Sequence, residues 1–395
     1  MDFQVFIVVL MIGGWLFSRA LSKMRLPSIL GMVIFGILLG IVGAQYIPQL
    51  AWDIEPFVKN LALVIILLRA GLGIKRQALN SVGKTALLMA LLPCTIEALV
   101  LAPLINMVFG LGWMPSLVAA WMLSAVSPAV VVPSMLEIQE KGIGQRNSLP
   151  VLILAAASVD DVVVITMFSV FLGIAVSAQG SGMMAGSMAR VAARIATVPF
   201  SLIGGIAIGA VCGLLLSWWF SRHHERIRAT EKVLLLLGAA FFLLEVGNII
   251  AVAALLGVMT VGFVLLERTN NVASELASKL SKVWIPAEIV LFVYIGMQLD
   301  PAVAMSTGWK GLAVICCGLF ARSIGVLVAL SFDRRFSFIE RLFCVVAYLP
   351  KATVQAALGA VPLAAGLAGG DVILSLAVIA ILFSAPIGLI LIRLV

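Results

Sequence analysis

The sequence predicts an all-α polytopic membrane protein with about 13 transmembrane helices, and three observations lead to this prediction. First, 63% of the 395 residues are hydrophobic and only 11% are charged, whereas a soluble domain carries roughly 25% charged residues. Second, apolar runs long enough to cross a bilayer fill the chain from end to end. Third, the basic residues are concentrated in every second connection between these runs. We therefore expect residues 1–395 to form one membrane domain.

Each predicted transmembrane segment is an apolar run bounded by charged or turn-forming residues. Segments 8 and 9 are the closest pair, because only the dipeptide "GN" separates them. In chain order the segments lie near residues 3–19, 26–45, 58–74, 82–108, 115–137, 148–174, 196–220, 231–247, 249–266, 283–299, 307–331, 338–364 and 372–393.

The basic residues predict how the chain is oriented in the bilayer. Of the 26 Lys and Arg residues, eighteen lie in connections after odd-numbered segments and four in connections after even-numbered segments. Because basic loops stay in the cytoplasm, the amino terminus should lie outside and the carboxyl terminus inside. The formal charge of +8 is therefore a mark of topology, and without interleaved aromatic residues it does not indicate a nucleic-acid partner. The five cysteines lack metal-ligand spacing, and we expect no cofactor.

Two adjacent carboxylates lie near the middle of segment 6, in the stretch "ILAAASVDDVVVITMF". A charge near the bilayer centre costs at least ~2.5 kcal/mol on insertion scales, so such residues normally face a cavity or a partner. Neighbours on a helix point about 100° apart, so Asp160 and Asp161 cannot share one environment. One could face a basic partner while the other faces a water-filled cavity. A structural ion pair is the alternative.

Two segments contain internal prolines, which remove backbone donors and interrupt a helix. Segment 5, "LSAVSPAVVVPSMLE", contains Pro128 and Pro133, and segment 12, "VVAYLPKATVQAALGAVPLAAG", contains Pro350 and Pro362, with Lys351 beside the first. The two interrupted segments are seven segments apart. An odd offset inverts one relative to the other, which predicts inverted repeats.

The same offset of seven pairs segment 4 with segment 11, and both contain a charge. Glu97 lies in "LLPCTIEALVLAP" and Arg322 lies in "CCGLFARSIGVLVAL". Opposite charges at comparable depths predict a buried bridge between them, although either could instead face the aspartates. If the bridge exists, removing Arg322 should leave a buried charge unpaired.

Several of these motifs together resemble the monovalent cation:proton antiporter superfamily, in particular its NHA branch of sodium/proton antiporters. The resemblance is carried by "LLRAGLGI", "PCTIEA", "SAVSPAVVVPSMLEIQEKGIG", "SVDDVV", "ARSIGV" and "LPKATVQAALG", which follow one another from segment 3 to segment 13. The compact chain is typical of a bacterial homologue located in the inner cell membrane.

The resemblance implies a homodimer, with a dimerisation side and an ion-translocating core in each protomer. The core would comprise residues 82–174 and 307–395, where the broken segments 5 and 12 cross. The dimerisation side would comprise residues 1–76 and 231–299, and residues 196–220 would form a linker helix. Transport would follow an elevator-type alternating-access mechanism.

By the same resemblance, Asp161 alternately holds the cation and the proton, and Asp160 assists. Arg322 falls where many relatives have a lysine that pairs with the first acidic residue. This departure leaves the proton stoichiometry open, because a permanently charged arginine is a poor proton carrier. Lys351 could compensate either aspartate.

The expected function is exchange of sodium or lithium ions for protons across the cell membrane, and not an enzymatic reaction. Carboxylate oxygen, the hydroxyls of Ser127 and Ser158 and the freed carbonyls of segment 5 are the expected cation ligands; Ser124 and Thr353 are weaker candidates. The alternatives are a potassium/proton antiporter and a sodium-coupled organic solute symporter. An ion channel and an intramembrane aspartyl protease account for the adjacent aspartates less well.

Overall fold

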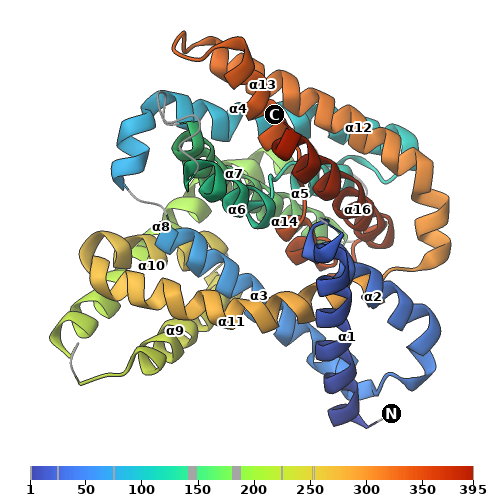
Figure 1. Ribbon diagram of the computed structural model, residues 1–395, viewed down its shortest axis with the longest axis horizontal. Helices are drawn as coiled ribbons and strands as arrows, with labels where there is room; N and C mark the ends of the chain where they lie inside the picture. Colours follow the sequence, from blue (N-terminus) through green and yellow to red (C-terminus); the bar gives the residue numbers. More distant parts are fainter. Residues whose placement is uncertain are drawn as a thin grey trace. The chain divides into compact units, whose positions relative to one another are not determined.

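The protein is helical throughout the residues that the computed structural model describes, with no strand among them (Figure 1). These residues are 2–24, 26–73, 76–140, 149–179, 188–223, 226–250, 252 and 254–394. Besides a 3₁₀ turn at Ala44–Tyr46, the helices are α1 (Phe3–Lys23), α2 (Ser28–Gly43), α3 (Gln49–Gly73), α4 (Arg76–Phe109), α5 (Trp113–Leu123), α6 (Pro128–Glu140), α7 (Leu149–Gln179), α8 (Met188–Arg222), α9 (Ala229–Ile250), α10 (Ala254–Arg268), α11 (Asn270–Met297), α12 (Pro301–Ser331), α13 (Phe338–Ala347), α14 (Thr353–Leu358), α15 (Val361–Ala364) and α16 (Gly370–Leu394).

The predicted segments correspond to these helices in order. Segment 5 comprises two helices, α5 and α6, and segment 12 comprises α13, α14 and the short α15. Segment 2 ends in the 3₁₀ turn and segment 4 begins at a kink in α4 at Gly83, while each remaining segment is a single helix. Within the described part of the chain, 8 helices are long and apolar enough to cross a membrane. Helix α2, helix α5 and the stretch from α14 to α15 are shorter and also apolar. The prediction of an all-α, multi-span membrane protein is confirmed.

The predicted boundary between segments 8 and 9 is wrong by a few residues. Gly247 and Asn248 lie inside α9, which continues to Ile250, and α10 begins at Ala254. A Cβ atom added to Gly247 would overlap the side chain of Ala254. The glycine therefore allows close approach of the following helix and does not end its own.

The prolines of the broken segments have different positions. Pro128 is the first residue of α6, where a proline has no helical donor to lose. Pro350 lies in the interruption between α13 and α14. Pro133, which the sequence suggested as a second point of interruption, lies inside α6, and the helix continues through it. The loss of a single ladder bond is tolerated in membrane helices, where neighbouring elements support the backbone.

The chain divides into two compact units. The first comprises residues 1–56, 81–176 and 289–395, and the second comprises residues 57–80 and 177–288. The first unit contains all of the core predicted from the sequence, and it also contains α1 and α2.

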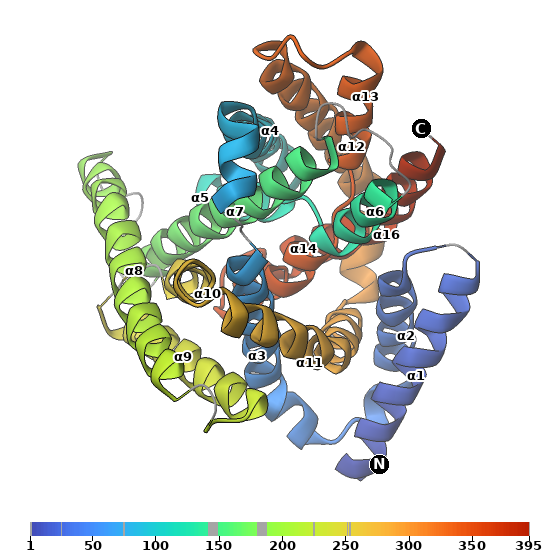
Figure 2. The same cartoon turned by 60° about the vertical axis from the view of Figure 1, so that its left-hand side comes forward.

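In the second unit, α8 packs along α10 (Figure 2). Glycines bring the two backbones together: a Cβ atom added to Gly209 would overlap the carbonyl group of Gly257. A Cβ atom added to Gly71 of α3 would likewise overlap the carbonyl of Met259 in α10. Small residues allow this kind of close backbone packing between membrane helices.

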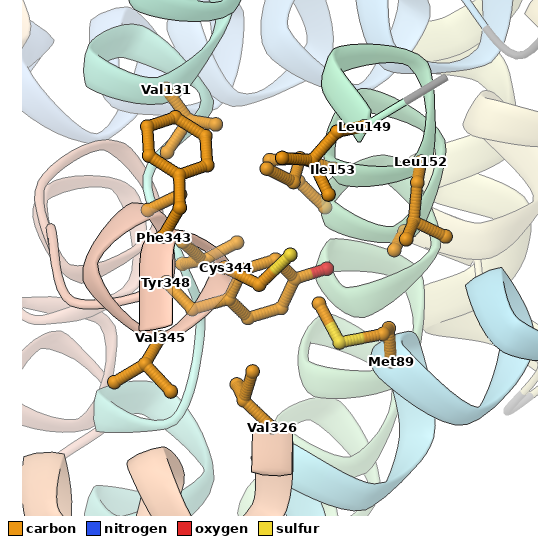
Figure 3. Close-up of a cluster of buried hydrophobic side chains, with 14 of the residues drawn as sticks. Met89, Val131, Leu149, Leu152, Ile153, Val326, Phe343, Cys344, Val345 and Tyr348 are labelled. Carbon is orange, nitrogen blue, oxygen red and sulfur yellow. The ribbon is translucent and has the colours of Figure 1, made fainter. Parts of the chain in front are cut away.

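In the first unit, a buried apolar cluster surrounds the end of α13 (Figure 3). It includes Met89 of α4, Val131 of α6, Ile153 of α7 and Val326 of α12. The ring of Tyr348, which follows α13 directly, lies among these side chains. The cluster therefore holds the last turn of α13, and with it the start of the interruption in segment 12, against four other helices.

Candidate functional site

The two interrupted segments meet at their interruptions. The first interruption covers residues 124–127, between α5 and α6, and the second covers residues 348–352, between α13 and α14. The backbone N–H of Ser127 donates to the carbonyl of Pro350 at 2.8 Å. In return, the N–H of Thr353 donates to Oγ of Ser127 at 3.4 Å. The two broken helices therefore cross, as predicted.

Side chains from the second half of the chain bind the carbonyls at the end of α5. Nε2 of Gln355 donates to the carbonyls of Met122 at 3.1 Å and Ala125 at 3.0 Å. Nζ of Lys351 donates to the carbonyl of Leu123 at 2.6 Å. The sequence suggested such carbonyls as cation ligands, because a helix end leaves them without intrahelical donors. Here they already accept from protein donors, one of which is itself a cation that would repel another.

Four buried charges form a continuous network around the crossing. Nη1 of Arg322 binds Oε2 of Glu97 at 2.9 Å, and Nη2 binds Oδ1 of Asp160 at 2.9 Å. Nη1 of the same guanidinium also donates to the carbonyl of Ser124. The other carboxylate oxygen of Glu97, Oε1, lies 2.7 Å from Nζ of Lys351. The expected ion pair of Glu97 and Arg322 is present, and the direct partner of Lys351 is Glu97.

The two adjacent aspartates of α7 have different surroundings. Besides its ion pair with Arg322, Asp160 accepts the backbone N–H of Val126 at 2.9 Å. Asp161 is 2% exposed, and its Oδ1 has no hydrogen-bond partner among the described residues. One carboxylate is thus fully compensated, while the other presents a buried oxygen without a donor.

Hydroxyl groups at the crossing supply further oxygen atoms. Oγ of Ser127 and Oγ1 of Thr353 lie 3.5 Å apart, and both side chains are buried. Ser124 is turned away, because its Oγ donates to the carbonyl of Ala120 within α5 at 2.7 Å. Ser158 lies on α7 one turn or less from the aspartates, but its side chain is outside the described residues.

Two residues of the site were not singled out from the sequence. Gln355 is a fully buried polar residue in an apolar stretch. The ring centre of Tyr348 lies 5.2 Å from Cζ of Arg322, which is the distance of a cation–π contact. The rule that identified the aspartates, a polar side chain at membrane depth, would also have found Gln355.

The balance of charge determines what this site can do. Among the described side chains of the network, Arg322 and Lys351 neutralise Glu97 and Asp160. The carboxylate of Asp161 is left over, and an isolated buried charge is costly unless it gains a counter-ion or a proton. The arrangement therefore favours a single small cation, bound through oxygen atoms, or a single proton.

The chain is similar over most of its length to several known proteins. The family model described as "Sodium/hydrogen exchanger, transmembrane" matches residues 7–395. Sodium/hydrogen exchanger 9B2 of Mus musculus is 31% identical over 399 residues, covering 97% of this chain and 70% of that protein. The protein of the same name from Homo sapiens is 31% identical over 389 residues, covering 93% of this chain and 69% of that protein.

Among solved structures, the sodium proton antiporter MjNhaP1 from Methanocaldococcus jannaschii, determined at pH 8, has a similar fold. The TM-score is 0.78 at 22% sequence identity, and the match covers 98% of this chain and 94% of that chain. At this identity the likeness concerns the fold alone.

Proposed function

The chain belongs to the sodium/hydrogen exchanger family, and from this premise we propose that it exchanges sodium ions for protons across a membrane. The observation that carries the proposal is the buried, uncompensated carboxylate of Asp161 beside a neutral network of four charges. A sodium ion and a proton would compete for this carboxylate. Lithium, which is also a hard monovalent ion, would use the same site.

We propose an exchange of one cation for one proton. With Glu97 and Asp160 balanced by Arg322 and Lys351, Asp161 supplies one negative charge, which one sodium ion or one proton neutralises. Both loaded forms are then neutral, and the empty form carries a net charge that is costly to move through an apolar environment. Only the loaded forms would move, and this constraint gives exchange without leak.

The proposed ligands of the cation are the carboxylate of Asp161, assisted by Asp160, and the hydroxyls of Ser127 and Ser158. Thr353, whose hydroxyl lies 3.5 Å from that of Ser127, is a further ligand. We leave out the carbonyls at the end of α5, because protein donors already bind them. Oxygen ligands of this kind suit a hard ion such as sodium.

We also propose the domain division that the family resemblance implies. Residues 82–174 and 307–395 would move as the core in an elevator-type mechanism, while residues 1–76 and 231–299 would form the dimerisation side of a homodimer. Residues 196–220 would link the two. The alternation of basic residues supports an outside amino terminus in the inner cell membrane.

The first test is proton movement in everted membrane vesicles with an acid interior, followed with a pH-sensitive dye as sodium, lithium or potassium is added. We expect sodium or lithium to cause alkalinisation of the interior in the wild type and no response in Asp161→Asn. Asp371→Asn, which changes an exposed carboxylate at the start of α16, is the matched control and should keep wild-type exchange.

The outcomes separate the candidate functions. A response to potassium alone would favour a potassium/proton antiporter. Exchange retained in Asp161→Asn would contradict the proposed site. No response to any of the three ions from folded wild-type protein would favour a sodium-coupled organic solute symporter. The one-to-one ratio is tested by counting the sodium ions and protons exchanged. A one-to-one exchange moves no net charge, so a membrane potential should not change its rate.

A further inference from the structure

A single peptide group connects two side chains of the crossing. The carbonyl of Ala125 accepts from Nε2 of Gln355 at 3.0 Å, and the N–H of Val126, at the other edge of the same peptide, donates to Oδ2 of Asp160 at 2.9 Å. This peptide lies in the non-helical stretch between α5 and α6. No helical ladder fixes its rotation, so its orientation depends on the groups that bind its two edges.

We propose that Gln355 is a positioning residue for ion exchange, which holds the peptide between Ala125 and Val126 so that its N–H points at Asp160. The inference rests on the function proposed above and adds a residue to it. The transported cation does not need to contact Gln355 for this role. The amide of Gln355 acts on the carboxylate through the backbone.

The buried amide oxygen of Gln355 supports a positioning role. Oε1 has no hydrogen-bond partner among the described residues, although the side chain is fully buried. Burying an unpaired acceptor is unfavourable, and an apolar side chain of the same size would avoid this. The amide nitrogen, in contrast, contacts three carbonyls at or just after the end of α5, those of Met122, Leu123 and Ala125. The N–H groups of the amide, and not its oxygen, therefore make the contacts of this side chain.

The other groups around Asp160 define what the peptide contributes. Arg322 of α12 neutralises one carboxylate oxygen, and Asp161 is the neighbouring charge on α7 itself. From the other elements, Cys94 of α4, Lys351 of the second interruption and Tyr348 at the end of α13 interact electrostatically with Asp160, and Glu97 of α4 acts through Arg322. Among the described residues, the N–H of Val126 donates to Oδ2 of Asp160. Losing this hydrogen bond destabilises the charged form of the carboxylate, so that protons bind to it more readily.

The experiment is sodium-dependent proton exchange by Gln355→Met, measured in vesicles across a range of pH and sodium concentration. Methionine has a similar size and no donor. We expect the apparent sodium KM to rise by roughly threefold or more, as for a weakened hydrogen bond to a charged group. The pH of half-maximal exchange should move upward, because protons then compete better, while the maximal rate changes less than about twofold.

A double-mutant cycle tests whether Gln355 acts through the peptide. Val126→Pro removes the N–H in a stretch that is not helical, and Gln355→Met should then have little further effect on KM. Ser116→Ala is the control: it removes a fully buried hydroxyl of α5 that has no hydrogen-bond partner among the described residues and lies away from the crossing. It should leave both KM and the pH profile unchanged.

Three results would overturn the positioning role: additive effects in the cycle, an unchanged KM and pH profile in Gln355→Met, or a Gln355→Met protein that does not fold. Each of these leaves the proposed function intact if the wild type exchanges and Asp161→Asn does not. Failure of the wild type to exchange would instead remove the proposed function itself.

Discussion

The crossing of the broken helices and the contact of α8 with α10 hold backbones together by opposite means. At the crossing, long side chains such as Arg322 and Gln355 reach across to carbonyls and carboxylates. Between α8 and α10, Gly209 and Gly257 remove side chains so that the backbones touch. Polar bridges can be rearranged or titrated, whereas a glycine contact has only one arrangement. Glycine contacts also occur in the first unit, where a Cβ atom added to Gly36 would overlap the carbonyl of Val293, so the contrast is between these two contacts and not between the two compact units.

The largest effect on stability should come from Arg322→Ala. It leaves Glu97 and Asp160 without their shared cation, and breaking a buried pair in this way costs about 3–5 kcal/mol. Thermal unfolding in detergent micelles would measure the loss. Arg335→Ala, at a cation whose side chain is 60% exposed, is the control and should cost under about 1 kcal/mol. Equal unfolding temperatures for the two variants would show that the network does not hold the crossing.

Gly209→Ala should have an intermediate effect on stability and little effect on exchange by each folded molecule. The added Cβ atom meets the backbone of Gly257, which cannot move aside like a flexible side chain, so the cost should be about 1–3 kcal/mol. Gly238→Ala in α9 is the matched control, because nothing lies near its added Cβ atom, and it should stabilise the helix by up to about 1 kcal/mol. The comparison fails if both variants unfold at the same temperature.

The smallest effect should come from a part-buried polar link between the start of the α4 span and the connection that follows α12. Oγ1 of Thr85 donates to Oδ2 of Asp333, which also binds Arg335. Hydrogen bonds, first from Arg335 and then from Thr85, hold the pKa of Asp333 well below its usual value. Because Asp333 is only partly buried and keeps its ion pair with Arg335, Thr85→Val should cost about 1 kcal/mol.

The pH dependence of this link has a definite sign. A carboxylate with a lowered pKa in the folded state contributes stability above its unfolded pKa of about 3.9, and this contribution is lost as the pH falls through the folded value. The difference in unfolding temperature between Thr85→Val and the wild type should therefore be constant from about pH 8 to pH 5 and should narrow below about pH 4. A gap that widens in acid would contradict the assignment.

Much of this organisation could be predicted from the sequence, because it depends on the bilayer. The length of the apolar runs defines the segments, and the basic loops predict their orientation. The cost of placing a charge at membrane depth identified Asp160, Asp161, Glu97 and Arg322. The partner of Lys351 could not be predicted in the same way. Glu97 meets one cation from α12 and one from the second interruption, which depends on how the helices are rotated about their axes and on the path of the interrupted segment. Sequence periodicity does not specify that rotation when a segment is apolar on all sides.

The role of Gln355 escaped prediction for a related reason. Its partners are backbone carbonyls, which every residue has, so nothing in the side chains of α5 indicates the contact. Only the crossing brings the end of α5 within reach. The same limit explains the boundary between α9 and α10, where the dipeptide of Gly247 and Asn248 looks like a turn, whereas Gly247 instead allows a close contact with Ala254.

The hydrogen bonds at the end of α5 also constrain how the protein is made. The carbonyls of Met122 and Ala125 depend on a side chain more than 200 positions later in the chain. During synthesis, the first half enters the membrane with these carbonyls unsatisfied in the protein, and it completes its backbone bonding only when Gln355 has emerged from the ribosome. The two halves are thus interdependent in biogenesis, and a truncation before residue 355 would leave the amino-terminal half with an open polar end in the bilayer.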